Sequence, residues 1–145
     1  MSYPEEFLKG IPNQNYIGDD DGPTSDLFYF QKRSDYTRCD GFLEESINWR
    51  DDIGADDSLF SQCKSDGSKQ FKSGAAILCR IELDRIIDKP FIKNKLSYER
   101  RIVGSNRYHG NLLLREEVKP REMKKIAATI ATVCVKSVIP NPKEL

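Results

Sequence analysis

The residue in this sequence best suited to acid–base chemistry near neutral pH is His109, its only histidine. Asn111 follows two residues later, and side chains two apart in a strand project from the same face. An imidazole and a carboxamide side by side can bind a phosphate or polarise a carbonyl group. Arg107 adds a guanidinium suited to phosphate recognition. We therefore predict that His109, Asn111 and Arg107 form the catalytic group of a candidate site.

Further polar residues are candidates for binding in the same site. Arg100 and Arg101 lie in the same stretch as the histidine and add positive charge. Glu45, Ser46 and Asn48 belong to an earlier predicted strand, where an acid or a hydroxyl would complete a site that cleaves or transfers a phosphodiester. A single histidine excludes sites that need two, and the sequence contains no glycine-rich phosphate loop, nucleophile elbow or zinc-protease motif.

A β-hairpin over residues 96–114 is expected to position these side chains. Its arms, 96–103 and 108–114, alternate in a way that is typical of strands with one solvated face. The Gly-Ser-Asn sequence at 104–106 suits a tight reversal between them. Gly110 gives up side-chain packing inside the second arm, which predicts either local twist or a bulge, or the close approach of another group.

The remaining elements follow from hydrophobic periodicity and from turn-forming residues. Strands are expected at 27–30, 42–50 and 71–81, and helices beginning at 51–57 and covering 82–87 and 120–138. A short helical turn is expected within 1–10, followed by a surface loop at 11–24. This order predicts an α+β fold with a mixed or mainly antiparallel sheet of about five strands, packed by a C-terminal amphipathic helix.

The chain length of 145 residues predicts a single domain. Within it we expect an N-terminal arm and loop over 1–25, an α+β core over 26–138 and a loose tail over 139–145. The 23 basic and 23 acidic residues balance, so no long-range field directs the chain to a polyanion or an anionic membrane.

The four cysteines are scattered without a C-x-x-C pair, which is poor spacing for zinc and for a disulfide framework. We therefore expect reduced thiols, as in a cytosolic protein, and no metal or cofactor. No apolar run is long enough to span a membrane, and the first ten residues are too acidic and polar for a secretory signal. A cytoplasmic protein with no membrane contact is expected.

The segments LFYFQKR, EESINW, GAAIL and SNRYHGNLLL follow one another between residues 27 and 135. This succession resembles a group of short, uncharacterised bacterial proteins with an aromatic or arginine-rich first strand, a Ser-apolar strand and an Asn-Pro-x-His sequence in a late hairpin. Asn106 and His109 stand at matching positions, while Arg107 replaces the proline. The resemblance implies a shared layout and a role for His109, and it implies no reaction type.

Two classes of function remain open. The first is a small, bacterial-type cytoplasmic protein that binds a protein partner, as an accessory of a multi-gene system, through the hairpin. The second is a phosphate-directed enzyme, a nuclease or nucleotidyl-type toxin, that uses His109 and nearby arginines on a nucleic acid or nucleotide. A deep pocket where His109, Asn111 and an arginine or acid converge would favour the enzyme, whereas an exposed apolar patch nearby would favour the binding protein.

Overall fold

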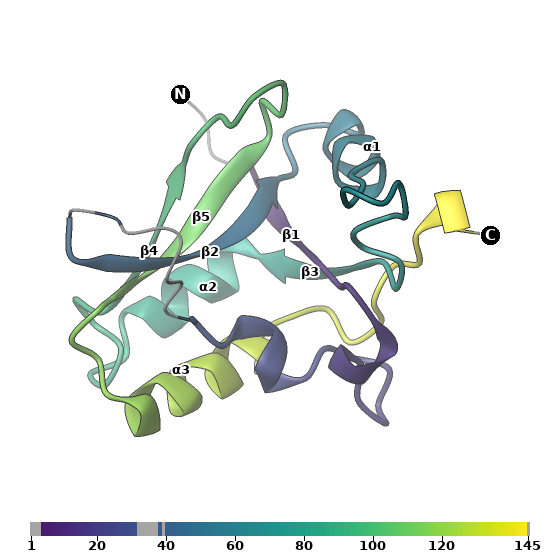
Figure 1. Cartoon of the computed structure of the whole chain (residues 1–145). Helices are drawn as coiled ribbons and strands as arrows, with labels where there is room; N and C mark the ends of the chain where they lie inside the picture. The colour runs from purple at the N-terminus through teal and green to yellow at the C-terminus, as the bar shows by residue number, and fades with distance from the viewer. Residues whose placement is uncertain (1–3, 32–37, 39, 145) are drawn as a thin grey trace.

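The structure is a computed structural model, which describes residues 4–31, 38 and 40–144; Cys39, predicted as a reduced thiol, lies outside them. The strands are β1 Glu6–Gly10, β2 Phe42–Trp49, β3 Ala75–Cys79, β4 Leu96–Arg100 and β5 His109–Arg115. They form one antiparallel sheet in the order β3-β1-β2-β5-β4 (Figure 1). The helices are α1 Gly54–Phe60, α2 Arg80–Ile87 and α3 Pro120–Thr132, with short 3-10 helices η1 Gln14–Tyr16, η2 Ser25–Phe28 and η3 Pro142–Glu144. The predicted α+β class, antiparallel sheet and C-terminal helix are confirmed.

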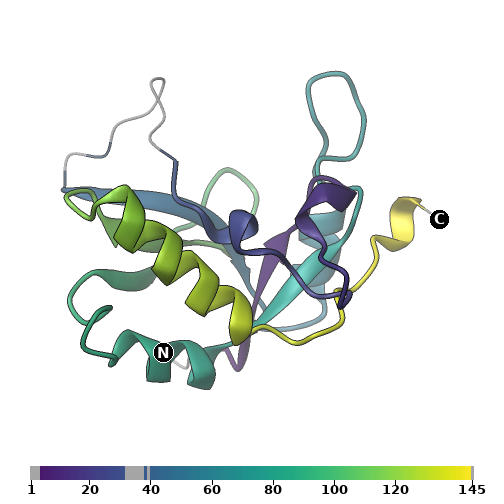
Figure 2. The ribbon, with the colours of Figure 1, turned by 90° about the horizontal axis from the view of Figure 1, so that it is seen from below.

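Different helices cover the two faces of the sheet. Phe7 and Leu8 are neighbours in β1, so their side chains point to opposite faces, and both are fully buried. Phe7 belongs to the larger core, which includes residues of α2 and α3, whereas Leu8 belongs to a smaller core with residues of α1. Figure 1 shows α2 and α3 below the sheet and α1 above its β1 and β3 end, and in Figure 2 α3 runs across the lower face.

The indole of Trp49 in β2 contacts both β1 and the hairpin strand β4. It packs edge-on against Phe7 and Tyr98, with ring centroids 5.3 and 6.0 Å away. Its Nε1 donates a hydrogen bond to the carbonyl oxygen of Glu99 at 3.3 Å. A Cβ built on Gly110 would lie 2.1 Å from this nitrogen. Close approach of another group, one of the alternatives predicted for this glycine, is therefore the reason why no side chain fits there.

Two predictions near the N-terminus are wrong. The described part of the segment predicted as a helical turn and arm contains β1, which pairs with both β2 and β3 inside the sheet. The strand predicted at 27–30 is replaced by η2, which packs against α3 and brings Phe28 into the larger core. Both errors concern short apolar runs, where periodicity cannot distinguish a strand from a buried helical turn.

The C-terminal helix is shorter than predicted, because α3 ends at Thr132 rather than near residue 138. The chain then runs along the outer edge of β3, where the Val135 amide donates to the Ile77 carbonyl and the Ile139 amide to the Ala75 carbonyl, both at 2.9 Å. These bonds occupy an edge that would otherwise expose unpaired backbone groups.

The segment predicted as a loose tail is held in place up to its last described residues. Asn141 is 2% exposed. Its Nδ2 donates to the carbonyl oxygens of Phe60 at 3.3 Å and Phe71 at 3.1 Å. The tail thus ties the end of α1 to the segment before β3. Within the predicted tail, Leu145 is the residue that lies outside the described ones.

Gly110→Ala is expected to destabilise the protein by about 1–3 kcal/mol, the usual effect of forcing extra atoms into filled space. The new Cβ must displace the Trp49 indole or the Glu99 carbonyl. Urea unfolding of the wild type and the variant measures the difference. Trp49→Phe is the control background, since its smaller ring leaves room at position 110 and should reduce the penalty. An equal penalty in both backgrounds would contradict the contact.

Candidate functional site

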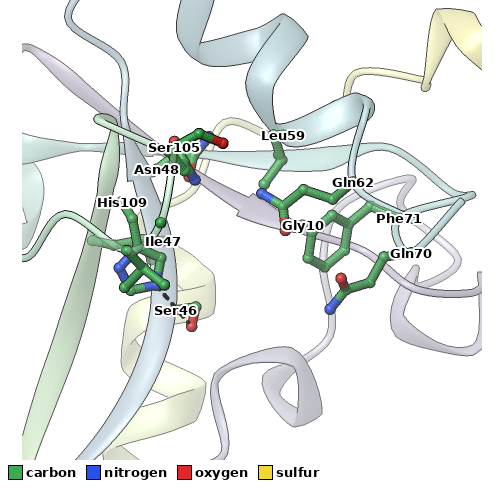
Figure 3. Close-up of a pocket in the computed structure, with 13 residues that line it drawn as sticks. Gly10, Ser46, Ile47, Asn48, Leu59, Gln62, Gln70, Phe71, Ser105 and His109 are labelled. Carbon is green, nitrogen blue, oxygen red and sulfur yellow. Dashed lines mark hydrogen bonds between the residues drawn. The ribbon is translucent and has the colours of Figure 1, made fainter. Parts of the chain in front are cut away.

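A cleft opens in the sheet where β1 and β2 stop pairing. The ladder between these strands ends at Leu8 with Asn48. The cleft beyond this point has a volume of about 420 Å³, within the ~300–1,000 Å³ typical of ligand sites. Figure 3 shows Ser46 and His109 on one side and, facing them across the opening, the segment that carries Gln62 and Phe71.

The lining of this cleft is uncharged and mixes polar side chains with apolar ones such as Leu59 and Phe71. Ser46 and Asn48 come from β2 and His109 from β5, while Gln62 and Gln70 extend their carboxamides into the opening from the other side (Figure 3). Aspartate, glutamate, lysine and arginine are absent from the lining in the described part of the chain. The site therefore offers hydrogen bonds without a net charge.

His109 is hydrogen-bonded through both ring nitrogens. Its Nδ1 lies 2.7 Å from the carbonyl oxygen of Arg101. Because a carbonyl can only accept, Nδ1 carries the hydrogen in the neutral ring and Nε2 is left as an acceptor. The Ser46 hydroxyl lies 3.2 Å from Nε2 and can donate to it. The three groups form a chain from hydroxyl to imidazole to backbone carbonyl.

The end of the hairpin explains why the ring lies there. The Arg101 amide donates to the His109 carbonyl at 2.9 Å, as a strand ladder requires, but the His109 amide turns to the Asn106 carbonyl at 3.3 Å. The imidazole takes the place of that amide at the Arg101 carbonyl. The β2–β5 register pairs Asn48 with His109, so Ser46, two residues along β2, projects from the same face.

A second polar network holds the cleft together. Asn48, which is 1% exposed, donates to the Ala55 carbonyl in α1 at 3.0 Å. Asn106 donates to the Asn48 side-chain oxygen at 3.1 Å and accepts from the Ser58 hydroxyl at 2.8 Å. The Tyr108 amide also donates to Asn106, at 3.1 Å. Strand β2, helix α1 and the hairpin loop are thus joined by bonds that satisfy buried polar groups.

Most residues that line the cleft were not predicted as part of the site, among them three with carboxamide side chains. Asn106 was predicted as part of the turn and named as a matching position in the resemblance, but it was not predicted as a site residue, although a carboxamide in a turn next to the histidine was a usable signal. Gln62 and Gln70 lie at the two ends of a loop closed by the hydrogen bond from the Gln70 amide to the Gln62 carbonyl, at 2.8 Å. Nothing in the local sequence indicates that this loop faces the hairpin.

Asn111 shares a face with His109, as predicted, but lies outside the cleft, in an ion cluster. Its Nδ2 donates to the carboxylates of Glu99 at 2.9 Å and Glu44 at 3.2 Å. Arg38 bridges the same two carboxylates at 2.7 Å each, with its side chain 7% exposed. The hydrogen bonds that Arg38 donates to Asp40 and then to Glu99 raise the pKa of Arg38, and the same bond to Glu99 lowers the pKa of that carboxyl group.

The predicted arginines do not converge on His109. Arg107 is paired with Asp52 at 3.2 Å and donates to the Tyr108 hydroxyl at 2.7 Å; that hydroxyl and the nearby carboxylate raise its pKa. Arg100 lies on the opposite face of the sheet, over the ring of Trp49. Arg101 reaches His109 through its backbone carbonyl.

Glu45 is also separated from the cleft. It alternates with Ser46 along β2 and therefore points to the other face, where it pairs with Lys9 at 3.3 Å. The same lysine donates to the Ser46 carbonyl at 3.2 Å. Of the predicted site residues, the structure brings together the side chains of His109, Ser46 and Asn48.

No family model matches the chain, and no curated protein or solved structure matches it. Among the residues with described positions, histidine, cysteine, aspartate and glutamate side chains form no group of three that could hold a metal ion. Over the same residues, no helix has the length and apolar character needed to cross a membrane.

His109→Ala is expected to lower the free energy of unfolding by about 1 kcal/mol, the usual net value of one hydrogen bond. His109→Asn should retain most of this stability, because its Nδ2 can replace the ring Nδ1 as donor to the Arg101 carbonyl. Urea unfolding of the three proteins measures both effects. The same loss in both variants would show that this bond does not hold the hairpin end.

Glu99→Gln is expected to change how stability depends on pH. The folded pKa of Glu99 lies below its ordinary value of 4.5, so its contribution is complete above that pH and is lost as pH falls through the lowered pKa. The variant should therefore be less stable than the wild type at neutral pH, and the two should converge in acid. Urea unfolding across this range measures the difference. A gap that stays constant into acid would contradict the Arg38 pairing.

Proposed function

We propose that this protein is a cytoplasmic binding module that takes an uncharged polar segment of a partner protein into the cleft between β1 and β2. The observation that carries the proposal is the lining itself. Hydroxyl, carboxamide and imidazole groups from β2, β5 and the 62–71 segment face one opening without a charged side chain among the described residues. Groups of this kind bond to peptide amides, carbonyls and neutral side chains.

Exposed apolar residues beside the cleft favour a protein as the partner. Val103 lines the cleft and is 52% exposed, and Ile102 next to it is 64% exposed. An uncharged cleft that combines polar groups with exposed apolar residues is the composition expected of a protein-binding surface. Such an apolar patch was the feature predicted to distinguish a binding protein from an enzyme.

The cleft is also preorganised. The Asn48 and Asn106 carboxamides are fixed by hydrogen bonds to α1 and to each other. Side chains that are already ordered lose less entropy when a partner binds, so more of the contact energy appears as affinity.

A phosphate-bearing partner receives less support. Binding a phosphate in this cleft would require a cation, and Arg100 and Arg107 are engaged with aspartates outside it. A nucleic acid or nucleotide would therefore meet an opening without positive charge. The position of these arginines outside the cleft favours the binding module over the phosphate-directed enzyme.

The described cysteines support a cytoplasmic location for the module. Cys63, Cys79 and Cys134 are free thiols. Burial raises the pKa of Cys134 to about 12, which keeps it protonated and unreactive. Unpaired thiols are typical of proteins in a reducing compartment.

Ser46→Trp is expected to block binding, because the indole would project from β2 into the cleft while strand structure tolerates tryptophan. The probe is a phage-displayed library of random twelve-residue peptides, selected on the wild type. Fluorescence anisotropy of the recovered peptides should give dissociation constants at least ~10-fold weaker for Ser46→Trp, a change equivalent to about 1.4 kcal/mol.

Ser97→Trp is the matched control, since Ser97 lies on β4, away from the cleft, and binding should not change. Val103→Asp should weaken binding by removing the apolar contact. The proposal fails if no peptide is enriched on the wild type, or if the enriched peptides bind Ser46→Trp as well as they bind the wild type.

A further inference from the structure

The chain of hydrogen bonds at His109 has the arrangement of an activated nucleophile. Ser46 Oγ lies 3.2 Å from the ring Nε2, and the ring Nδ1 lies 2.7 Å from the Arg101 carbonyl. Hydrogen-bond reach from nucleophile to base, and from base to an orienting group, is the geometry required for nucleophilic catalysis. The sequence predicted Ser46 as a binding residue of the same site, but the structure supplies the hydrogen bond between these two residues, which are 63 positions apart.

The two reacting groups are held on a rigid part of the fold. Ser46 lies in β2 and His109 at the start of β5, and these strands are paired along seven positions. The backbone carbonyl of Arg101 selects the tautomer that leaves Nε2 free to accept a proton. The serine is solvent-exposed and lines the cleft, so a substrate can reach its hydroxyl.

We infer that Ser46 and His109 form a catalytic pair that hydrolyses neutral carboxylic esters bound in this cleft. The Arg101 carbonyl acts as the positioning group. The substrate class follows from the lining: a carboxylate or phosphate would meet no cation there, whereas a neutral ester needs only hydrogen bonds. Gln62 and Gln70 extend carboxamide N–H groups into the opening, where they can donate to the oxyanion that forms on the ester carbonyl (Figure 3).

The reaction proceeds in two steps with water as the second reactant. In the first, Ser46 Oγ forms a bond to the ester carbonyl carbon while Nε2 of His109 takes the hydroxyl proton. The tetrahedral intermediate then expels the alcohol oxygen, which receives that proton, and leaves an acyl-serine. In the second step a water molecule loses its proton to Nε2 and attacks the acyl carbon. The Ser46 oxygen leaves, regains the proton, and a carboxylic acid is released.

The test uses an alkyl fluorophosphonate with an uncharged chain, which transfers its phosphoryl group to activated serines with loss of fluoride. Peptide mass spectrometry of the folded full-length protein should locate one adduct on Ser46. Ser46→Ala should remove it, and Ser97→Ala should label like the wild type. His109→Asn keeps a donor to the Arg101 carbonyl but lacks Nε2, and should label at least ~100-fold more slowly, the lower end of general-base effects.

Hydrolysis of p-nitrophenyl butyrate above the Ser46→Ala background should follow the same order among the variants. Absence of a Ser46 adduct on the folded wild type would overturn the inference, and so would equal labelling of a folded His109→Asn protein. Labelling of the wild type tests the catalytic pair even if His109→Asn folds poorly. Ser46→Ala leaves the cleft open to peptides, so catalysis and partner binding can be tested separately. If the wild type binds peptides but is not labelled, only the catalytic pair is contradicted and the proposed binding function stands.

Discussion

The ladder between β1 and β2 stops after Leu8 and Asn48, and the candidate site exists because it stops there. If the two strands continued to pair, their backbones would stay at hydrogen-bonding distance and would leave no room for a cleft. Past that point, the ring of Phe71 lies against Gly10, where a Cβ would be only 2.3 Å from a ring carbon. The Phe71 ring therefore fills the space that a side chain at position 10 would need. The glycine lets the 62–71 segment close over β1 and form the second wall of the cleft.

The larger apolar core and the polar network of the site lie on opposite faces of the sheet. The larger core lies on the opposite face of the sheet, where Trp49 packs against its aromatic neighbours. On the cleft face, buried Asn48 and half-buried Asn106 join three elements by hydrogen bonds. Each of these bonds satisfies a group that would be costly to bury alone. The larger apolar core therefore lies on one face of the sheet, and the polar network that shapes the site lies on the other, beside the smaller core.

Local sequence predicted the fold best where its pattern was long or where chain neighbours interact. The hairpin arms, β2 and α3 were all anticipated, because alternation or helical spacing persists over many residues there. The failures were the segments at 6–10 and 27–30, whose few apolar residues are buried by elements distant in sequence. For Gly110, the sequence predicted the close approach of another group as one alternative, but only the structure identifies that group as Trp49.

For the candidate site, the sequence by itself determined which side chains share a face, because alternation along a strand is a local property. It placed His109 with Asn111, and Ser46 with Asn48, before any strand order was known. Only the tertiary structure decided which of these faces meet. The β2–β5 register puts Ser46 beside the imidazole, directs Glu45 to the far face, and leaves Asn111 hydrogen-bonded to Glu99. Pairing between distant strands depends on side chains throughout the core, and no local pattern encodes it.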